Sequence, residues 1–163
     1  QKRVGLRRKD FTLYKFRSMI VDAEKDGKSQ PATDHDPRIT PVGRVLRATR
    51  LDELPQLIDI LIGNMSLVGP RPERIEHVDK YSEDIPEFKY RLKVRGGLTG
   101  YAQLYGKYNT SPYDKLQLDL IYIQNYSIFL DIRLIFMTLK IMFMKESTEG
   151  FSEQQKNELQ EKR

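Results

Sequence analysis

The sequence predicts an α+β fold: a mainly helical single domain with a small N-terminal β-hairpin, a few short strands and a peripheral association with a membrane. The first 19 residues are rich in β-forming side chains around a polar turn, whereas from Thr40 onward apolar residues recur at helical spacing. The chain has 163 residues, 39% of them hydrophobic, which suits one compact core. We expect a domain at residues 1–150 and a polar C-terminal tail at 151–163.

Charge and cysteine content narrow the possible partners and sites. The net charge is +5, yet residues 1–17 hold seven Lys and Arg residues against one Asp, so the remainder is nearly neutral. A basic end favours an anionic partner such as lipid headgroups, a phosphorylated substrate or nucleic acid; a merely solvated surface is the alternative. Without cysteine, the chain has neither a disulfide framework nor a thiolate metal site. No stretch resembles a signal peptide or a spanning helix of ~20 apolar residues.

The N-terminal elements are predicted in order as a hairpin, a loop and a helix. Residues 3–19 form the hairpin around Arg8-Lys9-Asp10. Lys15 and Arg17 lie there among apolar and aromatic residues, which indicates either contact with an anion or ordinary snorkelling. Residues 22–36 are polar and predict a helix end followed by a loop. Thr40-Pro41 then combines a capping residue with a first-turn proline, which predicts a helix start.

An acidic pair, Asp52 and Glu53, is the centre of the functional interpretation. We expect Asp52 to cap a helix with Pro55 in its first turn and Gly63-Asn64 at its end. Capping and the helix dipole alone would explain both acids. However, arginines precede the pair, and the cationic turn Gly69–Pro72 follows a short strand. Carboxylates beside guanidinium groups at a helix N-terminus suit a phosphate together with a divalent cation. The apolar stripe of this helix comprises Leu54, Leu57, Ile58, Leu61 and Ile62.

The second half predicts further short elements. Arg95–Gly100 is expected to be a glycine-rich loop that brings backbone N–H groups close to an oxyanion, although this pattern alone is weak. Residues 101–105 are expected to form a short strand. A helix from Ser111 to about Tyr126 carries Lys115, Asp119, Tyr122 and Tyr126 on a face suited to a polar cleft, although Asp119 can also simply pair with Lys115. Short helices are expected at Glu73–Lys80 and Pro86–Lys93, the latter with Phe88 and Leu92 inward.

The last predicted helix, Ile128–Met144, has two apolar faces. One face carries aliphatic side chains, and the other interleaves phenylalanines with Arg133 and Lys140. Charged residues make membrane spanning costly, but rings alternating with cations suit the headgroup boundary of a bilayer. The alternative is a second face buried in the protein core.

Several motifs occur in a fixed order. K-F-R-S-M at Lys15–Met19, L-D-E-L-P-Q-L, N-M-S-L-V-G-P-R-P and G-L-T-G-Y-A-Q at Gly97–Gln103 closely resemble the bacterial sugar transferase family, the monotopic phosphoglycosyl transferases. The resemblance runs from about Arg3 to about Gly150. It implies transfer of a sugar-1-phosphate from a nucleoside diphosphate sugar, expected to be UDP-linked, to polyprenyl phosphate. It also implies that the protein acts at the cytoplasmic face of the bacterial inner membrane, with a membrane-embedded segment expected before Gln1.

The resemblance also implies roles for individual residues. Asp52 would be the nucleophile that forms an aspartyl-phosphosugar intermediate, and Glu53 would help hold Mg²⁺. Cationic and polar side chains would bind the substrate; these are Lys15, Arg17, Arg71, Arg95, Thr99, Gln103, Lys107 and Asp119. The sequence departs from the family pattern where Gly96 replaces proline, where Tyr101 replaces tryptophan, and where Y-G-K-Y-N replaces N-G-R-N. This last departure leaves the role of Lys107 open.

Two other functions remain as alternatives. A non-catalytic nucleic-acid-binding module would use the basic N-terminus and Tyr101, Tyr105 and Tyr108 as stacking groups, but it leaves Asp52 and Glu53 unexplained. A Mg²⁺-dependent phosphohydrolase would use the same acidic pair with water as the acceptor. We expect no nucleic-acid partner, because only the transferase explains the motifs together.

Overall fold

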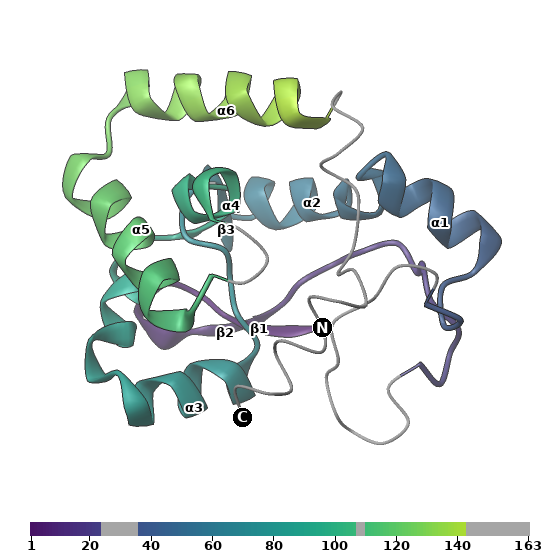
Figure 1. Ribbon diagram of the computed structural model, residues 1–163, viewed down its shortest axis with the longest axis horizontal. Coiled ribbons are helices and arrows are strands. Elements are labelled where there is room, and N and C mark those ends of the chain that lie inside the picture. Colours follow the sequence, from purple (N-terminus) through teal and green to yellow (C-terminus); the bar gives the residue numbers. More distant parts are fainter. Residues whose placement is uncertain (24–35, 107–109, 143–163) are drawn as a thin grey trace. The chain divides into compact units, whose positions relative to one another are not determined.

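The computed structural model describes residues 1–23, 36–106 and 110–142 (Figure 1). These residues form two compact units. The first comprises Gln1–Tyr14 and the described part of Pro55–Ile141, and the second comprises the described part of Lys15–Leu54 with Met142. The fold class is α+β, as predicted, with short strands among many helices. The expected boundary at residue 150 and the tail at 151–163 lie outside the described residues.

The first unit begins with the predicted hairpin. Strands β1 (Lys2–Val4) and β2 (Asp10–Thr12) pair antiparallel with Lys2 opposite Thr12, and a 3-10 turn, η1 (Leu6–Arg8), connects them (Figure 1). The hairpin is shorter than predicted because the chain turns to other partners beyond β2. The backbone N–H of Tyr14, for example, donates to the Asp59 carboxylate at 3.1 Å.

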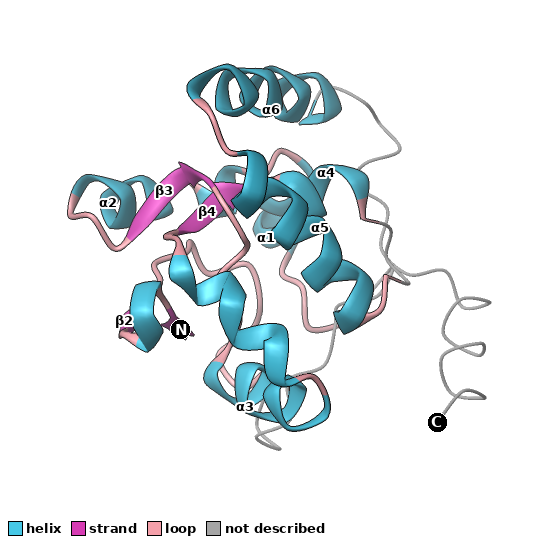
Figure 2. Ribbon diagram, turned by 90° about the vertical axis from the view of Figure 1, so that its left-hand side faces the viewer, coloured by secondary structure: helices cyan, strands magenta, loops and turns pink. Residues whose placement is uncertain are grey.

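Two parallel strands, β3 (Met65–Val68) and β4 (Gly96–Thr99), form the second sheet, with Ser66 opposite Gly97 (Figure 2). The expected glycine-rich loop is therefore mostly a strand, because its backbone groups are taken up by pairing. Residues 101–105, predicted as a strand, form a helix instead: Leu104 N–H donates to Gly100 O at 3.2 Å. The helices of this unit are α2 (Gln56–Leu61), α3 (Ile75–Asp84), the 3-10 helix η3 (Pro86–Lys93), α4 (Tyr101–Tyr105), α5 (Pro112–Asn125) and α6 (Ile128–Met142).

Helix α2 buries polar side chains and exposes its predicted apolar stripe. Its buried side chains are polar, with Gln56 1% and Asp59 0% exposed, whereas Leu61 and Ile62 are 85% and 62% exposed. Asp59 accepts a hydrogen bond from the side chain of Asn64 at 3.4 Å, so its partners come from the protein. The predicted apolar stripe therefore faces away from the core of this unit. Helical periodicity identified the stripe but not the side that packs.

Two hydrophobic clusters hold the first unit together. One joins the hairpin to α3, η3 and α5 through Val4, Val78, Phe88 and Leu116. The other joins β3, α5 and α6 through Val68, Tyr122 and Leu134. Helix α5 contributes to both clusters, and its start is the predicted one: Ser111 caps it by accepting from Asp114 N–H at 3.1 Å. Of the face expected to line a polar cleft, Asp119 and Tyr122 are buried in the unit, whereas Tyr126 is 66% exposed.

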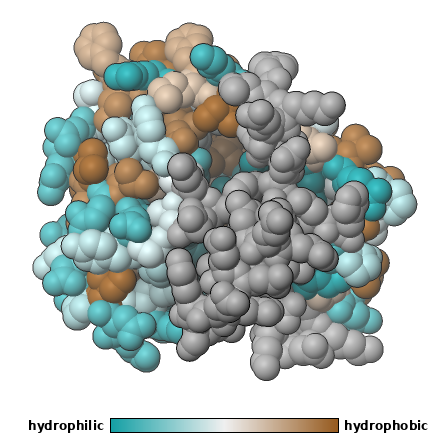
Figure 3. Space-filling model, viewed as in Figure 1, coloured by the Kyte–Doolittle hydropathy of each residue, from teal (hydrophilic) through white to brown (hydrophobic). Residues whose placement is uncertain are grey.

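Helix α6 exposes most of both faces described in the sequence analysis. Leu134 is fully buried, whereas Phe129 is 82% and Phe136 67% exposed, with Arg133 and Lys140 exposed beside them. Apolar atoms gather along this helix at the top of the surface view (Figure 3). A second core-facing side is therefore wrong for Phe129 and Phe136. Phe143 and Met144 lie outside the described residues. Among the residues that the structure describes, no helix combines the length and hydropathy of a membrane span.

The second unit contains helix α1 (Pro41–Ala48) and the 3-10 turn η2 (Leu51–Glu53). The predicted helix start is confirmed: Thr40 caps α1 by accepting from Gly43 N–H at 2.9 Å. Gly43 packs directly on the Ser18 backbone, where a Cβ atom would come within 1.9 Å of the carbonyl oxygen. The loop predicted at residues 22–36 lies largely outside the described residues. This unit places the acidic pair at the end of a short connection after α1.

Candidate active site

The acidic pair lies in η2 of the second unit, not at the cap of a long helix. The helix that follows, α2, begins at Gln56 with Pro55 before it and without a capping side chain. Arg50 precedes η2 with a left-handed φ of 58°, a conformation that non-glycine residues adopt at a cost. The capping explanation for Asp52 is therefore wrong, which removes the main structural reason for an aspartate here.

Lys15 contacts the acidic pair directly. Its Nζ donates to Glu53 Oε1 at 2.7 Å, and both side chains are mostly buried. The neighbouring Phe16 N–H donates to the backbone oxygen of Asp52 at 3.0 Å, so the segment with Lys15 is fixed against η2. The Lys15 ammonium group therefore does not snorkel to solvent, because it binds the Glu53 carboxylate. Arg17 is exposed in the same segment.

Asp52 is half-buried in a field of mixed charge. Burial raises the pKa of Asp52 above its ordinary value; the nearby Lys15, Arg47 and Arg50 act against this, while Glu53 adds to it. The pKa of Asp52 is raised overall, so the surrounding cations do not fully offset the effects of burial and of the Glu53 charge. An additional positive charge would therefore be favourable here, and a carboxylate with such a balance is a candidate reactive group.

In the first unit, the cationic turn Gly69–Pro72 packs against β4 backbone to backbone. Gly69 N–H donates to Thr99 O, and Gly97 N–H donates to Pro70 O, each at 2.9 Å. There is no room for a side chain between them, because a Cβ on Gly97 would lie 2.1 Å from the nitrogen of Gly69. Among the N–H groups of the predicted loop Arg95–Gly100, that of Gly97 is thus not available to an oxyanion, since it already donates to Pro70 O.

The remaining predicted site residues of this unit have different surroundings. Arg71 lies half-buried in the turn, and Arg95 is exposed just before β4. Thr99 is nearly buried and its hydroxyl lies 2.6 Å from that of Thr138 in α6. Gln103 is half-buried in α4. Lys107 lies outside the described residues. The turn and β4 therefore bring Arg71 close to the strand that carries Thr99.

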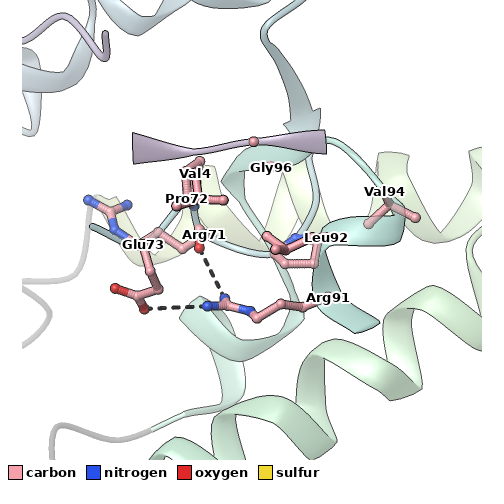
Figure 4. A pocket seen from close by; sticks show the side chains of 10 residues that line it. Val4, Arg71, Pro72, Glu73, Arg91, Leu92, Val94 and Gly96 are labelled. Atoms are coloured by element: carbon pink, nitrogen blue, oxygen red, sulfur yellow. Dashed lines mark hydrogen bonds and ion pairs between the residues drawn. The ribbon is translucent and has the colours of Figure 1, made fainter. Parts of the chain in front are cut away.

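Asp119 has a partner that neither sequence interpretation named. It is 1% exposed and bound to Arg91, whose Nη2 lies 2.7 Å from Asp119 Oδ2. Burial raises the pKa of Asp119, and the Arg91 guanidinium opposes this shift. Lys115 pairs instead with Glu73 at 2.8 Å. Arg91 and Glu73 also line a small pocket beside the turn, together with Val4, Pro70, Arg71 and Gly96 (Figure 4).

Sequence reasoning missed both Arg91 and Glu73. Arg91 occurs in a cationic stretch, E-F-K-Y-R-L-K, where nothing marks one basic residue as buried. Glu73 follows the turn and was expected to begin an ordinary helix. A weak signal was available for Arg91: in a helix with Phe88 and Leu92 inward, it falls three residues after Phe88, on the same face.

Within the described residues, no three acidic or histidine side chains converge as a closed metal site. Mg²⁺ does not require one, because it usually binds one or two carboxylates together with substrate phosphates and water. The carboxylates of Asp52 and Glu53 supply hard oxygen ligands of the kind that such a cation binds, and burial leaves the charge of Asp52 incompletely compensated.

Comparison with known proteins identifies the family. The model of the bacterial sugar transferase family matches residues 1–145. The chain belongs to this family. It is 45% identical over 143 residues to the UDP-N-acetylgalactosamine-undecaprenyl-phosphate N-acetylgalactosaminephosphotransferase of Aeromonas hydrophila, covering 86% of this chain and 34% of that protein.

Two further relatives of this bacterial sugar transferase carry other sugars in their names. The UDP-glucose:undecaprenyl-phosphate glucose-1-phosphate transferase of Escherichia coli K12 is 43% identical over 144 residues, covering 85% of this chain and 31% of that protein. The undecaprenyl-phosphate galactose phosphotransferase of Salmonella typhimurium is 38% identical over 159 residues, covering 88% and 33%. The chain thus spans about a third of these relatives, whose sugars differ.

Proposed function

We propose that this sugar transferase moves a sugar-1-phosphate from a nucleoside diphosphate sugar, expected to be UDP-linked, to undecaprenyl phosphate or a similar polyprenyl phosphate. Family membership and the names of three relatives support the reaction class. The observation that carries the proposal for this chain is Asp52: a half-buried carboxylate with a raised pKa, in a turn where it caps no helix.

The chemistry would take place in two displacements at one phosphorus. A carboxylate oxygen of Asp52 attacks the sugar-bearing phosphorus, an aspartyl–phosphate bond forms, and the bond to the nucleoside monophosphate breaks. An oxygen of polyprenyl phosphate then attacks the same phosphorus, which releases Asp52 and yields a polyprenyl diphosphate sugar. Asp52 must be ionised to attack, and Lys15 favours that form by lowering its pKa.

Charge neutralisation and positioning would supply most of the acceleration. Arg71, Arg95 and Lys107 are proposed to bind phosphate oxygens, with Arg17, Thr99, Gln103 and Asp119 in supporting positions. Glu53 would help hold Mg²⁺, which when bound neutralises charge on the diphosphate. Because Lys15 already donates to Glu53 at 2.7 Å, it fixes the direction of that carboxylate.

The test is transfer by the full-length protein with the substitution Asp52→Asn. We expect loss of both nucleoside monophosphate release and of the phosphosugar trapped on protein, while Asp59→Asn, a buried aspartate of α2, serves as a folding control. Full transfer by the Asp52→Asn protein would remove the nucleophile assignment. Assays with and without polyprenyl phosphate separate the transferase from a phosphohydrolase, which would release product equally in both.

We also propose that α6 lies at the surface of the bacterial inner membrane, on its cytoplasmic side. The exposed rings of Phe129 and Phe136 would enter the headgroup boundary, and Arg133 and Lys140 would meet anionic headgroups. We expect Phe129→Ser/Phe136→Ser to weaken binding to anionic vesicles, with the melting temperature unchanged within about 2 °C since neither ring is buried. A large loss of stability with unaltered vesicle binding would show that this face packs on protein.

A further inference from the structure

A buried cluster of charges lies directly behind the cationic turn. Arg91 is 3% and Asp119 1% exposed, and Glu73 and Lys115 complete the cluster from α3's N-terminal side and from α5. Removing charges from water is expensive, and apolar side chains often replace a buried ion pair without loss of stability. Stability alone therefore gives little reason for this cluster.

The Arg91 guanidinium uses its fork of donors on three different partners. Nε and Nη2 bind Asp119 Oδ2 at 3.0 and 2.7 Å, and Nη1 lies 3.7 Å from Glu73 Oε1. Nη2 also donates to the backbone oxygen of Arg71 at 3.0 Å (Figure 4). The side chain packs over the Phe88 ring, 4.8 Å from its centroid. The contacts with Asp119, Glu73 and Phe88, on the side away from the turn, thus fix the orientation of the Arg91 side chain.

The turn depends on its carbonyl groups for support. Two of its four residues, Pro70 and Pro72, have no N–H to donate. Pro70 O accepts from Gly97 N–H at 2.9 Å, Pro72 O accepts from Arg3 at 3.3 Å, and Arg71 O accepts from Arg91. The bond from Arg91 thus holds the peptide that joins Arg71 to Pro72, between the contacts made at Pro70 O and Pro72 O.

We propose that Arg91 is a positioning residue, which sets the direction of the Arg71 side chain toward the phosphates of the nucleotide sugar by holding the Arg71 carbonyl oxygen. Asp119 binds the Arg91 guanidinium and fixes its position. Asp119, a predicted site residue, therefore has a role behind the cationic turn. The inference rests on the proposed function for its substrate. It requires the planar fork of arginine, because lysine keeps the charge but cannot bind Asp119 and the turn in the same geometry.

A double-mutant cycle in the full-length protein tests the assignment. Arg91→Lys should raise KM for the nucleotide sugar on the order of tenfold or more, as small displacements of a binding group do, with a smaller change in kcat. Arg71→Gln should raise KM at least as much. If Arg91 acts through Arg71, the Arg71→Gln/Arg91→Lys protein should have the KM of Arg71→Gln alone.

Lys115→Met is the matched control, because it removes a charge from the same cluster without touching the turn. We expect a loss of stability comparable to that of Arg91→Lys and a KM within about twofold of wild type. Hydrogen exchange gives a second readout, since Arg91→Lys should increase exchange at Gly97 N–H, which donates to Pro70 O of the turn, and Lys115→Met should not.

Multiplicative KM effects in the cycle, or equal KM effects for Arg91→Lys and Lys115→Met, would overturn the positioning role and leave Arg91 as a structural residue. A wild-type protein that turns over no nucleotide sugar would instead overturn the proposed function, and the positioning role with it. The two failures are therefore distinct.

Discussion

Gly97→Ala inserts one methyl group between the cationic turn and β4. Its Cβ would lie 2.1 Å from Gly69 N, 2.4 Å from Thr99 O and 2.6 Å from Gly69 O. All three neighbours are backbone atoms, and Gly69 N–H and Thr99 O are bonded to each other at 2.9 Å. The methyl group therefore cannot be accommodated by the rotation of a flexible side chain.

The size of the required backbone shift determines the expected loss in the free energy of unfolding. An ordinary contact begins at 3.4 Å, so the backbone of Gly69 must move by about 1.3 Å, or the β3–β4 pairing must open. Overpacking a core typically costs 1–3 kcal/mol, even where side chains can adjust. Because this move also breaks backbone hydrogen bonds, we expect a loss of about 3–5 kcal/mol in the free energy of unfolding.

Urea denaturation followed by circular dichroism measures this loss. Gly63→Ala is the control, because Gly63 has a φ of +85° but no atom within 4 Å of the position that an added methyl group would take. It should cost only about 1 kcal/mol from its backbone conformation. A Gly97→Ala protein as stable as Gly63→Ala would refute the close packing of the turn on β4, and with it the fixed position of Arg71.

Three further predictions concern single side chains. Burial raises the pKa of Asp52 in the folded protein, so Asp52 ionises at lower pH in the unfolded chain, and the folded state loses stability as pH rises above about 4. The melting temperature of Asp52→Asn at pH 7 should therefore equal or exceed that of wild type, and a lower melting temperature contradicts this. Glu73 has a pKa held well below its ordinary value: burial alone would raise it, but His77, Lys115 and Arg91 outweigh burial. Wild type should thus lose stability as pH falls below about 4, and Glu73→Gln should flatten that dependence in acid titration. Phe88→Ala, at a fully buried ring, should cost about 3–5 kcal/mol in urea denaturation, and under 1 kcal/mol would place Phe88 outside the core.

The sequence correctly predicted those elements whose first residues carry a local start signal. Thr40-Pro41 and Ser111-Pro112 each combine a capping hydroxyl with a proline whose missing N–H costs nothing, and both helices begin there. The N-terminal hairpin was likewise predicted from β-forming residues around a polar turn. In each case the information lies within a few residues of the element itself.

Elements decided by distant partners were mispredicted. Residues 101–105 are an exception, because their helix is made by local bonds: Gln103 N–H and Leu104 N–H donate to Gly100 O, which outweighs the β-forming tyrosines. Gly96 and Gly97 indicated a loop, yet they lie in a strand, where a Cβ on Gly97 would clash with Gly69 and one on Gly96 with Pro72. For α2, periodicity located the apolar stripe, but Asp59 packs inward because it binds Tyr14 N–H, 45 positions earlier.

Of the candidate site, sequence reasoning named the acidic pair, Lys15 and the cationic turn. The ion pair from Lys15 to Glu53 agrees with that grouping, although motif order rather than physical spacing suggested it. Arg91 was missed because its importance depends on burial by η3 and α5, which no local pattern in a basic stretch reveals. Roles in catalysis for the named residues stay predictions until the variants are measured.

The pKa values of Glu73 and Asp52 shift in opposite directions, and the surroundings of the two carboxyl groups explain the difference. Glu73 has Lys115 at 2.8 Å and Arg91 at 3.7 Å, and its negative charge is stabilised in the fold. Asp52 has cations nearby as well, yet its charge remains disfavoured. A fully compensated carboxylate is a poor nucleophile toward phosphorus, since attack would have to break those pairs. An under-compensated one gains from forming an acyl phosphate, and this difference favours Asp52 over Glu73.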